Sequence, residues 1–221
     1  MKVTLLAHTP EPEKVCAAAA RSCYSGDGAS DLLDKKDPEA FLAKVVGMGH
    51  ESVIEHAVFT FSVEGVSRSL THQLVRHRIA SFSQQSQRYV SLEEPTYVVP
   101  ETVRGDEAKE KAYREAMESA WKSYNDLMAA GIPAEDARYV LPNGCTTNIT
   151  ITMNARELRH FFTLRCCNRA QWEIREMADK MLELCKEVSP AIFANAGPAC
   201  VRGPCPEGKK SCGHPRRRSS V

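Results

Sequence analysis

The densest group of chemically useful side chains lies between residues 73 and 88. Guanidinium groups bind phosphate through paired hydrogen bonds, while amides and hydroxyls can recognise a base or a sugar. The group therefore predicts a pocket for a phosphate and a base. The alternative is a solvated helix end, where basic side chains favour the C-terminus. The residues of the group are Gln73, Arg76, His77, Arg78, Ser81, Gln84, Gln85, Ser86, Gln87 and Arg88.

A second cluster begins at Asn154 and includes Arg156, His160 and Arg165. In a helix, Asn154, Leu158, Phe161 and Arg165 would share one face, because their spacings are 4, 3 and 4. An arginine on the same stripe as Leu and Phe is expected to be partly buried. Burial of an unpaired cation is costly, so Arg165 should meet an anion, a carbonyl or a carboxylate. An internal salt bridge, for example to Glu173, is the alternative.

Other parts of the chain carry weaker signals. His50 and Ser52 stand in the segment Gly49–His56, where a histidine before a strand is more often structural than catalytic. No G-x-G-x-x-G motif and no phosphate-loop motif occurs, which argues against a Rossmann dinucleotide site and a P-loop. The motifs of the zincin metalloproteases and the α/β-hydrolases are absent as well.

The chain has nine cysteines, an odd number, and no C-x-x-C pair. Without a secretory signal, this favours reduced thiols over a disulfide framework. Three of the cysteines lie near the C-terminus and, with one histidine, would offer four soft ligands to a metal. Their spacing matches no common metal site, so we expect no metal and a glycine-rich, mobile tail. These four residues are Cys200, Cys205, Cys212 and His214.

Charge and hydropathy exclude several classes of protein. The 221 residues include 29 Lys and Arg and 28 Asp and Glu, a net charge of +1. Residues 201–221 contain six basic residues and one acidic residue, so the body is mildly acidic and any positive site must be built locally. No stretch approaches the roughly 20 apolar residues of a membrane helix. We expect a cytoplasmic protein with no membrane partner.

The elements that position these clusters can be predicted from periodicity. Strands are expected at 2–7, 56–63 and 146–153, and residues 81–91 are expected to form a loop. Helices are expected at 38–47, 66–78, 106–130, 134–140 and 154–186, the last one broken near Asn168. In the helix 106–130 the inward residues would be Ala116, Trp121, Tyr124 and Leu127. The class is α+β, a single domain with a small antiparallel sheet surrounded by long helices. The domain would span 1–198 and the tail 199–221.

The run Arg76-His77-Arg78, followed after seven residues by Ser86, resembles the R-H-R-x7-S signature of the flavin-dependent thymidylate synthases. Other segments resemble blocks of the same family in the same order, and together they cover most of residues 15–175. These are Arg21 to Tyr24, Gly49 to His56, Arg138 to Pro142, Asn154 to Leu158, and Arg165.

The resemblance implies an enzyme, a methyltransferase that makes dTMP from dUMP. Methylenetetrahydrofolate would supply the carbon, and reduced FAD, recharged by NADPH, would supply the hydride. It also implies a homotetramer with active sites between subunits, and a family-specific flavin-binding fold in place of a Rossmann fold.

The resemblance also assigns residues to each ligand. Arg165 would lie against the uracil as the catalytic residue, where its guanidinium stabilises negative charge on the base. The remaining dUMP-binding residues would be Gln73, Arg76, Gln84, Gln85, Ser86, Gln87, Arg88 and Arg138. The FAD-binding residues would be His50, Ser52, Arg76, His77, Arg78, Gln84, Asn154, Arg156 and His160.

The alternative function is a nucleotide- or RNA-binding module that uses the arginine clusters. Few aromatic residues interleave these clusters and the body is acidic, so no nucleic-acid partner is expected.

Overall fold

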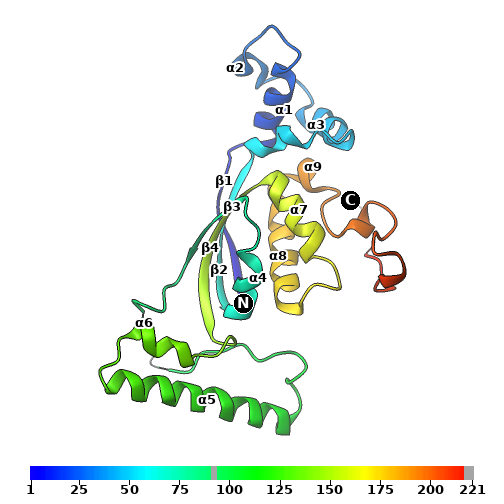
Figure 1. Ribbon diagram of the computed structural model, residues 1–221. Coiled ribbons are helices and arrows are strands. Elements are labelled where there is room, and N and C mark those ends of the chain that lie inside the picture. Colours follow the sequence, from blue (N-terminus) through cyan, green and yellow to red (C-terminus); the bar gives the residue numbers. More distant parts are fainter. Residues whose placement is uncertain (91–93, 217–221) are drawn as a thin grey trace. The chain divides into compact units, whose positions relative to one another are not determined.

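The computed structural model describes residues 1–90 and 94–216 (Figure 1). The strands are β1 (Lys2–His8), β2 (Val58–Ser67), β3 (Ala80–Gln84) and β4 (Thr146–Asn154). Short 3-10 segments are η1 (Glu51–His56), η2 (Arg138–Val140), η3 (Ala199–Val201) and η4 (Gly208–Lys210). The α-helices are α1 (Pro12–Ser22), α2 (Ala29–Leu32), α3 (Pro38–Gly47), α4 (Arg68–Leu74), α5 (Glu107–Ala129), α6 (Ala134–Ala137), α7 (Ala155–Arg165), α8 (Trp172–Val188) and α9 (Pro190–Phe193).

The four strands form an antiparallel sheet in the order β1-β2-β4-β3. Alternate residues of β2 are buried, among them Phe59, Phe61 and Val63. Ile149 and Ile151 are buried in the same way on β4. This period of two places one side of each strand against apolar side chains. The predicted α+β class, with a small antiparallel sheet and long helices, is confirmed.

The chain divides into two compact units. Unit 1 comprises residues 1–2, 63–76 and 83–149, and unit 2 comprises residues 3–62, 77–82 and 150–221. Strands β2, β3 and β4 each contribute residues to both units, so the division does not separate two consecutive stretches of sequence. No helix in the described part of the chain is both long enough and apolar enough to cross a membrane.

The core of unit 1 forms around α5. Asp106 caps this helix, since its side chain accepts a hydrogen bond from the Lys109 amide. Met117 and Trp121 are buried against Cys145. Tyr124 is buried too, whereas Ala116, which we predicted to face inward, is exposed, because Met117 occupies the inward position of that turn.

Unit 2 packs α7 against α8 and both α1 and α7 against η1 (Figure 1). Its core is rich in phenylalanine: the ring of Phe193 lies 5.4 Å from that of Phe59 and 6.1 Å from that of Phe162. Edge-to-face contacts of this kind add to the free energy gained by burying the rings. The predicted break near Asn168 is confirmed, since α7 ends at Arg165 and α8 begins at Trp172.

Three predictions of secondary structure are wrong or incomplete. Residues 80–84 form strand β3 where we predicted a loop over 81–91; residue 91 lies outside the described residues. The strand escaped prediction because its serines and glutamines lack the apolar alternation of a buried strand. The helix predicted over 66–78 is α4, which spans only Arg68–Leu74: it begins later than predicted because β2 continues to Ser67, whose side chain caps α4, and it ends earlier. Helix α1, with its buried alanines, was not predicted.

Candidate functional site

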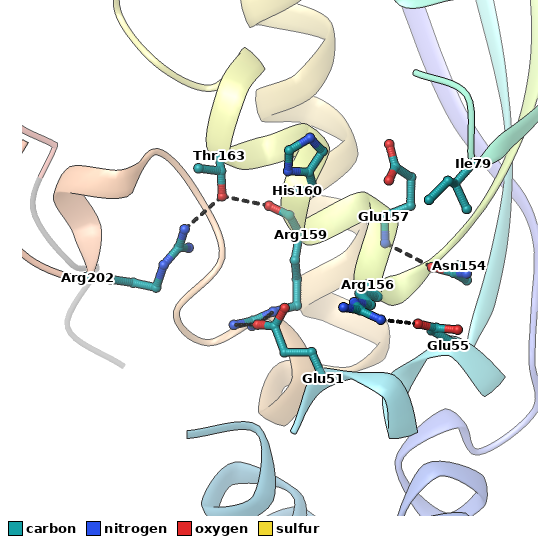
Figure 2. Close-up of a pocket in the computed structure, with 10 residues that line it drawn as sticks. All are labelled: Glu51, Glu55, Ile79, Asn154, Arg156, Glu157, Arg159, His160, Thr163 and Arg202. Atoms are coloured by element: carbon teal, nitrogen blue, oxygen red, sulfur yellow. Dashed lines mark hydrogen bonds and ion pairs between the residues drawn. The ribbon is translucent and has the colours of Figure 1, made fainter. Parts of the chain in front are cut away.

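A cavity of about 660 Å³ lies in unit 2, at the N-terminal part of α7 (Figure 2). A volume of this size is typical of ligand sites. Helix α7 supplies most of the polar wall, and η1 and the C-terminal tail supply the rest. The lining residues are Glu51, Glu55, Ile79, Asn154, Arg156, Glu157, Arg159, His160, Thr163 and Arg202.

Local interactions at the start of α7 fix this wall. The Asn154 side chain accepts a hydrogen bond of 2.9 Å from the Glu157 amide, so it satisfies one of the free N–H groups of the helix. Arg156 is paired with Glu55 of η1, with 2.5 Å between Nη1 and Oε1 (Figure 2). The side chain of Arg156 is 54% exposed, so this ion pair is screened by water and can be exchanged at low cost.

Two further arginines are held more firmly. Arg159 is buried, pairs with Glu51 at 3.1 Å and donates to the Ile192 carbonyl at 2.6 Å. Arg202, from the tail, donates to the Thr163 hydroxyl at 2.7 Å (Figure 2). Burial of a cation is tolerated when it is paired and hydrogen-bonded, as Arg159 is here. The cavity thus has cationic donors whose positions are set by neighbouring acceptors.

Behind this wall, His77 joins two residues of α7. Its Nδ1 lies 3.3 Å from Glu157 Oε1, and its Nε2 accepts a hydrogen bond of 3.0 Å from Arg165 Nε. The His77 ring is buried and stands edge-on to Phe161, with 4.9 Å between centroids. Burial, with smaller effects from Arg165 and His160, lowers the pKa of His77 to about 4, so the imidazole is neutral at physiological pH.

Arg165 lines a second cavity, of about 350 Å³. Its wall is formed by the link between α7 and α8 and by the tail, including Cys200, Cys205, Cys212 and His214. Burial lowers the pKa of Arg165, yet a guanidinium stays protonated in proteins. The predicted partial burial of Arg165, on one stripe with Leu158 and Phe161, is confirmed.

The tail is attached to the α7–α8 link and to α8 by several hydrogen bonds. Arg216 pairs with both carboxylate oxygens of Asp179, at 2.5 and 2.8 Å. The Asn168 side chain donates to the His214 carbonyl at 2.9 Å, and Arg169 donates to the Lys210 carbonyl. Residues 199–216 therefore pack on the same unit as Arg165, which argues against a mobile tail. Residues 217–221, with Arg217 and Arg218, lie outside the described residues.

The predicted dUMP residues other than Arg165 lie in unit 1. Gln84 donates to the hydroxyls of Thr71 (3.1 Å) and Thr147 (3.3 Å). Arg88 pairs with Glu135 at 2.8 Å, and Arg138 Nε donates to the carbonyl of that same residue at 3.0 Å. Glu135 thus brings together two of the arginines predicted to bind a nucleotide.

The remaining residues of this set lie nearby in sequence. Gln73 Nε2 donates to the Ser69 carbonyl, and Gln87 Nε2 contacts Cys145 Sγ at 3.2 Å. Ser86 Oγ accepts a hydrogen bond from the Arg88 amide. Gln73 lies in α4, but Arg76 and His77 lie beyond its end at Leu74, although the predicted helix over 66–78 included all three.

The predicted FAD residues separate into two groups. Asn154, Arg156 and His160 line the cavity of about 660 Å³, and His77 contacts Glu157 in its wall. His50, Ser52 and Arg78 are exposed and are not among the residues that line this cavity, while Arg76 and Gln84 belong to unit 1.

Several residues of the cavity were missed by the sequence analysis. Glu51 and Glu55 stand beside predicted residues, and Arg159 follows Arg156 at helical spacing, so proximity to a predicted residue was the available signal. Arg202 had no such signal, because it is brought to α7 only by the fold of the tail.

The cysteines show no sign of disulfide bonding or of activation by a lowered pKa. All nine cysteines are free thiols, and burial raises the pKa of Cys16 to about 12 and that of Cys166 further, so both stay protonated. Within residues 1–90 and 94–216, no group of three or more His, Cys, Asp and Glu side chains could hold a metal ion.

Comparisons with known proteins identify relatives over almost the full chain. Residues 4–191 match the family model described as thymidylate synthase complementing protein. A flavin-dependent thymidylate synthase of Geobacter sulfurreducens is 55% identical over 218 residues, which cover 96% of this chain and 94% of that protein. Proteins of the same name from Clostridium tetani and Pyrococcus abyssi are 50% and 46% identical, over 96% and 94% of this chain and 93% and 90% of their own.

Proposed function

The chain belongs to the flavin-dependent thymidylate synthase family, and on that premise we propose how its residues carry out the reaction. It converts dUMP to dTMP, takes the carbon from methylenetetrahydrofolate and uses FAD. Bound FAD in its reduced form supplies a hydride. What the residues of this chain contribute is binding, orientation and charge.

The lining of the larger cavity in unit 2 suits FAD in its chemistry. A diphosphate needs cationic donors, and Arg156, half-exposed and paired only with a surface glutamate, can exchange Glu55 for phosphate oxygens. Ile79 and His160 offer an apolar and an aromatic surface to a ring system. We assign Asn154, Arg156 and His160 to FAD. His50, Ser52, Arg76, His77, Arg78 and Gln84 remain part of this proposal on the resemblance alone.

The polar group of unit 1 is the proposed dUMP site. Arg88 pairs with the Glu135 carboxylate and Arg138 donates to the Glu135 backbone carbonyl, so a phosphate could take the place of the carboxylate on Arg88. The amides of Gln84, Gln85 and Gln87 are half-buried, a setting in which hydrogen bonds to a base or a sugar discriminate well. Gln73, Arg76 and Ser86 complete the set.

Arg165 is the proposed catalytic residue. Its guanidinium is charged and partly buried, and such a group stabilises negative charge that develops on the uracil better than a solvated one would. This charged side chain beside a neutral, buried histidine is the observation that carries the proposal most directly.

Other elements of the proposal rest on the family alone. NADPH is the proposed source of reducing equivalents, and the proposed assembly is a homotetramer with active sites at subunit interfaces. The cytoplasm is the proposed location, since a nucleoside monophosphate is a metabolite of the cell interior. We also propose residues 1–198 as the catalytic domain and 199–221 as a tail, whose described part, 199–216, packs on unit 2.

The proposal is tested by the colour of the protein. Purified protein should be yellow, or become yellow with added FAD, and an Arg156→Ala variant should bind FAD at least several-fold more weakly. Arg114→Ala, which removes an exposed arginine of α5, is the matched control and should bind FAD normally. Protein that binds RNA oligonucleotides but no FAD would favour the alternative of a nucleic-acid-binding module.

A further inference from the structure

Glu157, His77 and Arg165 form a continuous hydrogen-bonded chain inside unit 2. Glu157 stands in the first turn of α7 and Arg165 at its last residue, so the two side chains are more than two helical turns apart. His77 spans this gap, with contacts of 3.3 Å to Glu157 Oε1 and 3.0 Å to Arg165 Nε. One ring therefore connects the wall of the larger cavity to the residue that lines the smaller one.

The proton positions along this chain follow from the chemistry of its ends. Arg165 Nε always carries a hydrogen and can only donate, so His77 Nε2 must present a lone pair to it. In a neutral imidazole the proton then resides on Nδ1, where it is donated to the Glu157 carboxylate. The low pKa of His77 is consistent with this neutral form.

The surroundings leave the ring little freedom. The side chains of His77 and Glu157 are only 3% and 8% exposed. Phe161 packs edge-on against the ring, and His160 lies 6.2 Å away between centroids. Burial raises the pKa of Glu157, with His160 opposing the change. Glu157, Arg165 and His160 are thus the titratable or charged groups described around His77.

We propose that Glu157 is a positioning residue: it accepts the Nδ1 proton of His77, and so holds the tautomer whose Nε2 accepts a hydrogen bond from Arg165 Nε. The hydrogen bond at Nε fixes the orientation of the guanidinium, and the two Nη groups are the ones that face the substrate in this proposal. The inference rests on the proposed role of Arg165 in the reaction. A carboxylate that fixes a histidine tautomer, and through it a second group, is a recurrent arrangement in enzymes.

The tautomer can be read directly in the wild-type protein. Long-range ¹H–¹⁵N correlation of ¹⁵N-histidine-labelled protein reports which ring nitrogen is protonated, and the His77→Gln variant identifies the signals of His77. At pH 7 we expect a single tautomer with the proton on Nδ1. A proton on Nε2 would overturn the inference without any recourse to activity.

Substitution of Glu157 tests the positioning role. Glu157→Leu removes the acceptor, so the tautomers should mix and kcat should fall roughly 10-fold or more at saturating FAD, since misplacement of a catalytic group by about 1 Å can cost about 100-fold. The KM for dUMP should change much less. Glu157→Gln keeps an oxygen acceptor and should retain the Nδ1–H tautomer and most of the turnover.

The matched control is Glu176→Gln, which alters an exposed ion pair with Lys180 on α8 and should change neither observable. An unchanged kcat in Glu157→Leu, or an equal loss in Glu157→Gln, would overturn the positioning role. If wild-type protein forms no dTMP, the proposed function fails, and the tautomer measured in the same protein shows separately whether the hydrogen-bonded chain exists.

Discussion

At the scale of single residues, the proposed chemistry depends on Arg165, a partly buried cation that stays charged. Burial lowers the pKa of Arg165, but a guanidinium has so high an ordinary pKa that its charge survives. A lysine in the same place would lose its charge more readily and has no Nε–H to donate to His77. The identity of this residue is therefore tied to its neighbour as well as to the substrate.

Replacement of Arg165 separates catalysis from cofactor binding. Arg165→Ala should lower kcat by a factor on the order of 100 to 1,000, because one preorganised charge-stabilising group is removed. FAD binding should persist, since Arg165 is not among the residues that line the larger cavity. Steady-state dTMP formation and FAD titration measure the two effects. Turnover within two-fold of wild type would refute the assigned role.

The buried His77 makes stability depend on pH. The pKa of His77 is about 4 in the folded protein, against an ordinary value of 6.5 that we take for the unfolded chain. Between pH 4 and pH 6.5 the unfolded chain therefore binds a proton at His77 that the folded chain does not. The contribution of His77 is complete above pH 6.5 and is lost as the pH falls toward 4, by about 3 kcal/mol in all. Glu157, whose pKa is raised, opposes this trend.

Urea unfolding of wild type and of the His77→Gln variant at several pH values measures this dependence. Both proteins contain Glu157, so the difference between their pH profiles reports His77. From pH 7 to pH 4 the free energy of unfolding should fall by about 3 kcal/mol more in wild type than in the variant. Parallel pH profiles would show that His77 titrates normally in the folded state.

Residue-level predictions succeeded where they depended on local spacing. The helical spacing of Leu158, Phe161 and Arg165 predicted the partial burial of Arg165, because helical periodicity fixes which side chains share a face. The partner of that cation, His77, stands 88 residues away and could not be inferred. Only the folded chain brings the two together.

At the scale of elements, the link between α7 and α8 is fixed by the tail. Asn168 and Asp179 together bind Arg216, and the tail covers the cavity that Arg165 lines. Arg202 of the tail also donates a hydrogen bond to Thr163 of α7. The region from 199 to 216 is thus bound to the C-terminal end of α7, to the link and to α8.

Truncation tests whether the tail supports the reaction. Protein that ends at Pro198 loses Arg202 and the wall of the smaller cavity, so both kcat and the melting temperature should fall. Protein that ends at Arg216 keeps the described contacts and should behave as wild type. Equal activity in the two truncated proteins would mean that the tail is a separate appendage with no part in the chemistry.

The elements themselves were predictable to the extent that they are amphipathic. Helix α5 and strands β2 and β4 were expected near their observed positions, because their apolar residues recur with the period of a helix or a strand. Strand β3 was not predicted, because Ala80–Gln84 has no alternating hydrophobic pattern. It is a strand because it pairs with β4. The start of α4 was misplaced for a related reason: the segment Val66–Ser67 belongs to β2.

At the scale of the whole molecule, the net charge of +1 does not show where the arginines lie or which acidic residues they pair with. In unit 1, Arg88 and Arg138 meet at Glu135, and in unit 2, Arg156 and Arg159 meet Glu55 and Glu51. Of the arginines that we assign to a ligand, Arg88 and Arg156 are paired with a carboxylate and Arg138 with a carbonyl. Composition alone predicted only that positive sites must be local, and the pairs were found in the folded structure.

The two units also divide the proposed ligands. Unit 1 contains the dUMP set apart from Arg165, and unit 2 contains the cavity that we assign to FAD. The sequence interleaves these sets, so their separation could not be predicted from order along the chain.

The central claim is that this chain makes dTMP in a flavin-dependent reaction. Mass spectrometry of the products formed by flavin-free protein, supplied with dUMP, methylenetetrahydrofolate, NADPH and FAD, tests it most directly. We predict dTMP in the complete mixture and none when FAD or the folate is omitted. Absence of dTMP from the complete mixture, or equal formation without FAD, would contradict the claim.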